Sequence, residues 1–269
     1  MSIYEDRTIM IYFCILAVIV GAVFGSFLNC TAWRIAHGEP FTKGHSRCPK
    51  CGHELSVKDW ISIFSWLFLG GKCRYCKEKI SVRYPLSEIV FSIMTVLCLL
   101  KCDLTVLCLR NLVFLGCLFC LSLVDIENYM IPDGCLLVMA IVWVAAIPFA
   151  FSEYGGWSGI GFHLLATVVY GGGMLGLSLL MDRILRKESL GGGDIKLFAV
   201  MGLYLGMTGS LFALLFACVL GLVPAVICRR READHGGIIP FGPAISIATW
   251  LMLLYGSHLV EWYWEFMCI

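Results

Sequence analysis

Eight long apolar runs constrain the fold of this chain more than any other feature. They cover residues 9–30, 85–100, 104–124, 134–151, 159–181, 195–205, 210–228 and 239–260. A run of about 18 or more apolar residues is long enough to cross the hydrocarbon core of a bilayer as a helix. The sixth run is short and follows three glycines, and the second and third lie close together. Six or seven crossings are therefore also compatible with the pattern, but eight fit it best.

Composition agrees with a membrane protein. Of the 269 residues 59% are hydrophobic and 14% are charged, and the mean hydropathy is +0.86. Average proteins have roughly 45–50% apolar and about 25% charged residues. The first apolar run is long, and Asn29-Cys30-Thr31 is a poor small-residue cleavage site. We therefore expect this run to be a retained span and not a signal peptide.

The distribution of basic residues predicts an orientation in the membrane. Residues 31–84 hold ten of the twenty Lys and Arg, residues 182–196 hold four, and residues 229–231 hold three. With eight crossings these segments fall on one side, and such a bias marks the cytoplasmic side. We expect both termini outside. We also expect three parts: a first transmembrane helix (1–30), a polar cytoplasmic insertion (31–84) and a helical membrane body (85–269).

Four of the fifteen cysteines form two pairs in the insertion. Cys48 and Cys51 make the first C-x-x-C pair, and Cys73 and Cys76 follow after twenty-one residues. Two such pairs predict four thiolates around one metal ion, and zinc takes four such ligands tetrahedrally in structural sites. Gly52 follows the first pair and lets backbone N–H groups turn toward the sulfurs. We expect structural zinc, although iron would use the same spacing.

Two acids lie at the edges of apolar runs, where charge is costly and marks function. Asp125 follows the third run, and Asp194 follows the glycines at 191–193. With eight crossings both acids lie at the cytoplasmic ends of their spans, where two carboxyl groups that meet can share a proton and activate water. Two separate acids solvated by lipid headgroups are the alternative. Asp133 follows Pro132 and fits the cap of the next helix.

Several stretches together resemble one family, the bacterial type IV prepilin peptidases, in order along most of the chain. They are residues 25–29 (GSFLN), 46–51 (SRCPKC), 65–67 (SWL), 71–76 (GKCRYC), 80–85 (ISVRYP), 125 with 132–133 (D and PD), 191–197 (GGGDIKL) and 239–243 (IPFGP).

The resemblance implies an activity. Asp125 and Asp194 would be the catalytic carboxylates of a G-x-G-D intramembrane aspartyl protease, one as general base and the other as general acid. The enzyme would remove the basic leader of type IV prepilins or pseudopilins, of a pilus or a type II secretion system, at the cytoplasmic membrane boundary. S-adenosylmethionine would then donate a methyl group to the new N-terminal residue, at a site that the sequence does not identify. The resemblance also implies a multi-pass protein of the bacterial inner membrane with its active site facing the cytoplasm. The expected partners are prepilins and lipid, and no nucleic acid.

Two other classes of protein share part of this pattern. A transporter would explain the spans and the acids within them, but it would not need two C-x-x-C pairs. An assembly component of a secretion machine would explain the zinc insertion, but it would not need Asp125 and Asp194. Cleavage of a prepilin by the purified protein separates these alternatives.

Overall fold

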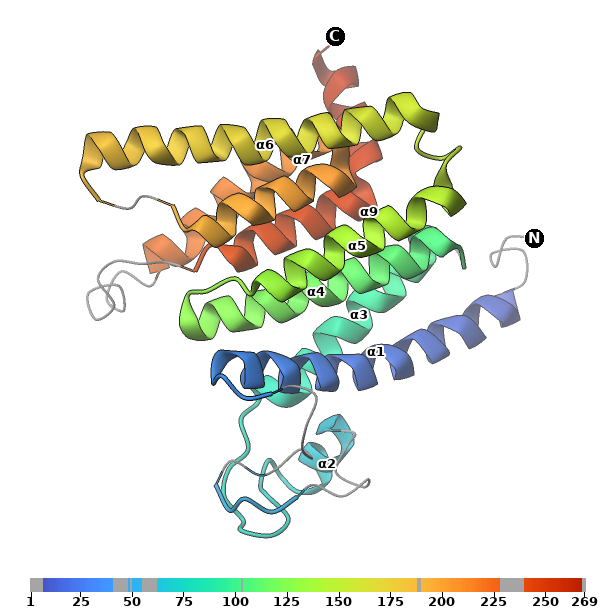
Figure 1. Cartoon of the computed structure of the whole chain (residues 1–269). Coiled ribbons are helices and arrows are strands. Elements are labelled where there is room, and N and C mark those ends of the chain that lie inside the picture. Colours follow the sequence, from blue (N-terminus) through green and yellow to red (C-terminus); the bar gives the residue numbers. More distant parts are fainter. Residues whose placement is uncertain are drawn as a thin grey trace. The chain divides into compact units, whose positions relative to one another are not determined.

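The computed structural model describes residues 7–40, 48, 50–54, 62–102, 104–187, 190–227 and 240–267 (Figure 1). The basic cluster at 229–231 and residues 46–47, 49 and 239 of the matching stretches lie outside these ranges. Within them the chain forms helices and no β-strand, which confirms the predicted all-α fold. The helices are α1 (Arg7–Ala36), α2 (Ser62–Phe68), α3 (Arg83–Cys102), α4 (Val106–Asn128), α5 (Asp133–Ala150), α6 (Gly156–Leu185), α7 (Gly192–Ile227) and α9 (Gly242–Met267).

All of these helices except α2 are long and apolar enough to cross a membrane. The chain divides into two compact units, residues 1–123 and 124–269, and α4 passes from the first unit into the second. Helix α1 continues to Ala36, beyond the end of the first apolar run at residue 30. The division into parts 1–30, 31–84 and 85–269 stays a prediction.

In the first unit α1 packs closely against α3. The buried residues of α1 include Gly21 and Gly25, which lie one turn apart on one face. A Cβ atom added at Gly21 would lie 2.6 Å from the Cα of Ser92, and one at Gly25 would lie 3.0 Å from the Cα of Glu88. The Ser92 hydroxyl also donates to the carbonyl of Val18 at 3.1 Å. Small residues of this kind let two helix backbones approach each other in a membrane.

The same principle joins α6 to α7 in the second unit. A Cβ atom added at Gly202 would lie 2.7 Å from the backbone nitrogen of Thr167, and one at Gly171 would lie 2.7 Å from the Cβ of Ala199. Helix α7 is also tied to α5, because the Tyr204 hydroxyl donates to the Met139 carbonyl at 2.8 Å. These contacts fix the first half of α7 between two neighbouring helices.

Helix α7 reverses direction at Gly206. That residue has φ 64° and ψ −165°, which is not helical. The ring of Phe241 lies 6.3 Å from the ring of Phe198, between centroids, and a Cβ atom at Gly221 would lie 2.5 Å from the Phe241 ring. Residues 198 and 221 would be about 35 Å apart in a straight helix. Residues 192–205 and 207–227 are therefore two antiparallel limbs, and Figure 1 shows both ends of α7 near the start of α9. The seven long helices thus carry eight spanning segments, as the apolar runs predict.

Candidate active site and metal centre

Asp125 lies at the start of the last turn of α4 and is held by a distant backbone group. Its side chain is buried, with 5% of the residue exposed. The backbone N–H of Gly242, the first residue of α9, donates to Oδ2 of Asp125 at 2.8 Å. Helix α4 continues to Asn128, three residues beyond the acid. The end of the apolar run indicates a helix that ends at Asp125. The structure instead places Asp125 within the helix, three residues before its end.

Asp194 is the third residue of α7 and is half-buried. Its backbone N–H donates to the carbonyl of Gly191 at 3.1 Å. A Cβ atom at Gly193 would lie 2.8 Å from the Cβ of Ile131, so the start of α7 packs directly against the connection between α4 and α5. This contact brings Asp194 to the end of α4 that carries Asp125. The contact between Phe198 of α7 and Phe241, beside Gly242, also brings the start of α7 to the part of the second unit that holds Asp125.

Asp133 does not have the role that the sequence suggests. The residue that precedes α5 is Pro132, which makes no side-chain cap hydrogen bond, and Asp133 is the first residue of the helix. Oδ1 of Asp133 instead lies 2.7 Å from Nζ of Lys196, two residues beyond Asp194. The side chains are 73% and 58% exposed. The prediction of a helix cap was wrong, because Pro132 occupies the cap position and Asp133 already belongs to the first turn of α5.

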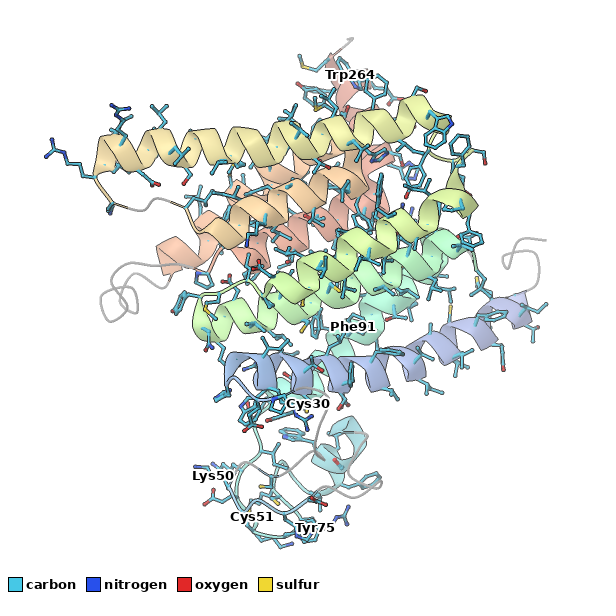
Figure 2. All side chains as sticks on the ribbon, viewed as in Figure 1. Cys30, Lys50, Cys51, Tyr75, Phe91 and Trp264 are labelled. Carbon is cyan, nitrogen blue, oxygen red and sulfur yellow. The ribbon has the colours of Figure 1, made fainter. Side chains whose placement is uncertain are left out.

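The four cysteines of the insertion meet at one point, as their spacing predicts. Their sulfur atoms all lie within 4.8 Å of one another, and the Sγ atoms of Cys48 and Cys76 are 4.0 Å apart. Four thiolates around a tetrahedral zinc ion lie about 3.8 Å apart, given a Zn–S distance near 2.3 Å. Cys51, which Figure 2 labels, and Cys73 complete the group. The arrangement fits a four-thiolate metal ion without large movement.

The two C-x-x-C pairs share two backbone features. The residue after each pair has positive φ, 70° at Gly52 and 62° at Lys77. The N–H of Gly52 donates to the Cys48 carbonyl at 2.9 Å, and the N–H of Lys77 donates to the Cys73 carbonyl at 3.1 Å. This repetition gives the thiols a common backbone frame. Lys77 is not a glycine, yet it adopts a positive-φ conformation that L-residues rarely take.

Hydrogen bonds and burial shift the pKa values of two thiols of the group, Cys73 and Cys76, in opposite directions. Burial raises the pKa of the Cys73 thiol, but backbone N–H groups of Cys76 and Tyr75 donate to its sulfur and lower the pKa to about 7. At Cys76 a hydrogen bond from the backbone of Glu78 lowers the pKa, but burial and the neighbouring thiols raise it to about 11. A divalent cation would offset the repulsion between four thiolates.

Aromatic contacts support the insertion around the thiols. The ring of His53 lies 3.6 Å from that of Tyr75, between centroids, and so joins the two pairs. The indole N–H of Trp66 in α2 donates to the Ile80 carbonyl at 3.1 Å. Figure 2 shows Lys50, Cys51 and Tyr75 together in this part of the first unit. His53 thus packs beside the cysteines and is not one of the four clustered donors.

These observations define a class of protein: an all-helical chain with eight spanning segments, two acids at the ends of such segments and a four-thiol insertion. Comparison with known families identifies the family. Residues 19–102 match the bacterial peptidase A24 N-terminal domain, and residues 112–226 match the type IV leader peptidase family. The chain belongs to the type IV leader peptidase family and is a multi-pass membrane protein.

Curated relatives cover almost the whole chain. A prepilin leader peptidase/N-methyltransferase of Pseudomonas putida is 31% identical over 92% of both chains, and the Pseudomonas aeruginosa protein of that name is 30% identical over 94% of both. The type 4 prepilin-like proteins leader peptide-processing enzyme of Escherichia coli O78:H11 is 31% identical over 87% of this chain and 90% of its own. Solved structures gave no significant match.

Proposed function

We propose that this protein cleaves the leader from type IV prepilins or pseudopilins with Asp125 and Asp194 as its catalytic carboxyl groups. The names of the relatives support the substrate class. Both acids lie in the part of the chain that matches the peptidase family. The observation that carries the assignment is a pair of close contacts, Gly193 with Ile131 and Gly242 with Asp125, at the end of the second unit where both acids lie.

The chemistry follows from two neighbouring carboxyl groups. One carboxylate takes a proton from water, and the water oxygen bonds to the carbonyl carbon of the scissile peptide. The other carboxyl group gives its proton to the leaving amide nitrogen as the C–N bond breaks. Oδ2 of Asp125 accepts the Gly242 N–H, and we assign the proton transfer to its other oxygen, Oδ1.

The methyltransferase activity is proposed from the names of the relatives alone. S-adenosylmethionine would supply the methyl group for the new N-terminal amine. Among the residues that the structure describes, no observation marks its binding site, so no residue is assigned to this step. In the insertion Cys48, Cys51, Cys73 and Cys76 would hold zinc, and the metal would supply a structural link between the two C-x-x-C pairs.

We place the active site on the cytoplasmic side of a bacterial inner membrane. The reversal of α7 at Gly206 supports this orientation, because it puts the basic segments 31–84, 182–196 and 229–231 on one side after eight crossings. Seventeen of the twenty Lys and Arg (10 + 4 + 3) then lie on that side, which is the pattern of cytoplasmic loops.

Incubation of the purified protein with a purified prepilin in lipid tests the proposal. We expect a product without its leader, and in the presence of S-adenosylmethionine a product heavier by one methyl group. Mass spectrometry of the new N-terminus reads both steps. An intact prepilin with wild-type protein, across several prepilins and pseudopilins, would contradict the function. Cleavage without methylation would contradict only the proposed methyltransferase activity.

A further inference from the structure

The start of α9 touches the proposed catalytic centre through one residue. Gly242 donates its N–H to Oδ2 of Asp125 at 2.8 Å, and this hydrogen bond is buried. The first N–H groups of a helix have no acceptor within their own helix. At the start of α9 the next residue, Pro243, has no N–H, and the N–H of Ile245 donates to the Phe241 carbonyl at 3.1 Å. The carboxylate thus satisfies a donor that the helix leaves open, at a terminus that favours negative charge.

Gly242 also has no room for a side chain. A Cβ atom built there would lie 2.8 Å from Oδ2 and 3.1 Å from Cγ of Asp125. A real Cβ atom essentially never comes within 3.0 Å of a heavy atom to which it is not bonded, and Asp125 is buried, so its short side chain would have to move. The absence of a side chain at residue 242 is therefore coupled to the position of this carboxyl group.

The neighbouring residue connects this point to the second acid. Phe241 packs against Phe198, with ring centroids 6.3 Å apart, and Phe198 lies one helical turn beyond Asp194 in α7. Phe198 is fully buried. Residues 241 and 242 thus link the helix that carries Asp194 to the carboxyl group of Asp125.

We propose that Gly242 is a positioning residue of the aspartyl pair, whose main-chain N–H fixes Oδ2 of Asp125 and so directs Oδ1 to the reacting water and peptide. This inference rests on the proposed function. It assigns a role to the stretch 239–243, which the family resemblance marks but leaves without one. Gly242 acts through Asp125 and does not touch the substrate.

The test compares Gly242→Ala with Gly173→Ala, because a Cβ atom at Gly173 in α6 would meet nothing within 4 Å. Displacement of a catalytic group by about 1 Å costs roughly 100-fold in rate. We expect Gly242→Ala to lower kcat by about that factor with little change in KM, and Gly173→Ala to leave both unchanged. Unchanged kcat in Gly242→Ala would overturn the proposal, and so would a rise in KM alone.

A thermal unfolding cycle separates positioning from general damage and needs no activity. We expect Gly242→Ala to lower Tm in the wild-type background but not beside Asp125→Ala, where the removed carboxyl group makes room for the new methyl. An equal loss of Tm in both backgrounds would overturn the contact itself. If the wild-type protein cleaves no prepilin, the proposed function and the catalytic role of Gly242 fail together, while this cycle still decides whether residues 125 and 242 are coupled.

Discussion

Gly193 and Gly242 show how missing side chains place the two acids. A Cβ atom at Gly193 would lie 2.8 Å from the Cβ of Ile131, and one at Gly242 would lie 2.8 Å from Oδ2 of Asp125. A side chain at either position would push the neighbouring segment away, and such overpacking typically costs about 1–3 kcal/mol. The distance between Asp125 and Asp194 therefore depends on the absence of a side chain at residues 193 and 242.

The G-x-G-D stretch offers a matched test of this idea. We expect Gly193→Ala to destabilise the protein by about 1–3 kcal/mol and to reduce prepilin cleavage, because the methyl collides with Ile131. Gly192→Ala should be nearly neutral, since a Cβ atom there meets nothing within 4 Å. Thermal unfolding and cleavage rates of the two variants are the measurements. Equal effects of both substitutions would contradict the contact.

Local signals in the sequence predict the acids and the cysteines but not their partners. An acid at the edge of an apolar run is visible from composition, and two C-x-x-C pairs are visible from spacing. The hydrogen bond from Gly242 to Asp125 joins residues 117 positions apart, and the pair Lys196–Asp133 joins residues 63 positions apart. These contacts depend on how the helices pack, which periodicity does not encode.

The four-thiol group makes a prediction about metal content. Purified protein should contain about one zinc per chain, held as a four-thiolate structural site. Cys73→Ser should lose it and become protease-sensitive in the insertion, because metal binding in such small modules supplies folding free energy. Cys218→Ser, which changes an exposed thiol of α7, is the control. Unchanged zinc in Cys73→Ser, or iron in its place, would contradict the assignment.

Among the elements, α7 departs most from a regular helix. Apolar runs at 195–205 and 210–228 predict two spans, and the structure joins them through a single residue with φ 64° and ψ −165°. That backbone conformation is nearly exclusive to glycine and costs other residues about 1–3 kcal/mol. The sequence pattern indicates the two limbs, but it does not show at which residue the chain turns or how sharply. The backbone angles of Gly206 show both.

Gly206→Ala should therefore destabilise the second unit by about 1–3 kcal/mol. The added methyl would also lie 3.4 Å from the His163 ring, which limits relaxation of the turn. Gly161→Ala in α6 is a suitable control, because a Cβ atom there meets nothing within 4 Å. Thermal unfolding in lipid or detergent measures both. A Gly206→Ala protein as stable as the control would show that the turn does not need glycine.

At the scale of the whole molecule, eight crossings and the charge distribution predict which loops share a side of the membrane. The connection after α5 and the connection after α6 lie one crossing apart, so they should face opposite compartments. The net charge of +1 carries no information about orientation. The orientation is predicted from the uneven distribution of Lys and Arg between the loops. The same count predicts that the insertion and both acids lie on the basic side.

Cysteine labelling in intact cells tests this topology. Cysteine introduced at Ser152, after α5, should react with a membrane-impermeant maleimide added outside, beyond the labelling of the wild-type protein. Cysteine introduced at Lys187, after α6, should react only after the membrane is opened. Both positions are exposed. Labelling of the Lys187→Cys variant from outside would contradict the predicted orientation.

The most direct test of the account is prepilin cleavage by three Asp→Asn variants of the purified, membrane-inserted protein. Asp125→Asn and Asp194→Asn should each lower the cleavage rate by roughly 10²–10⁴-fold or more, because each removes a group that transfers a proton. Asp133→Asn should cleave at near the wild-type rate, since it weakens only an exposed ion pair worth about 0–1 kcal/mol. Full activity in either of the first two variants, or loss of activity in Asp133→Asn alone, would contradict the aspartyl pair.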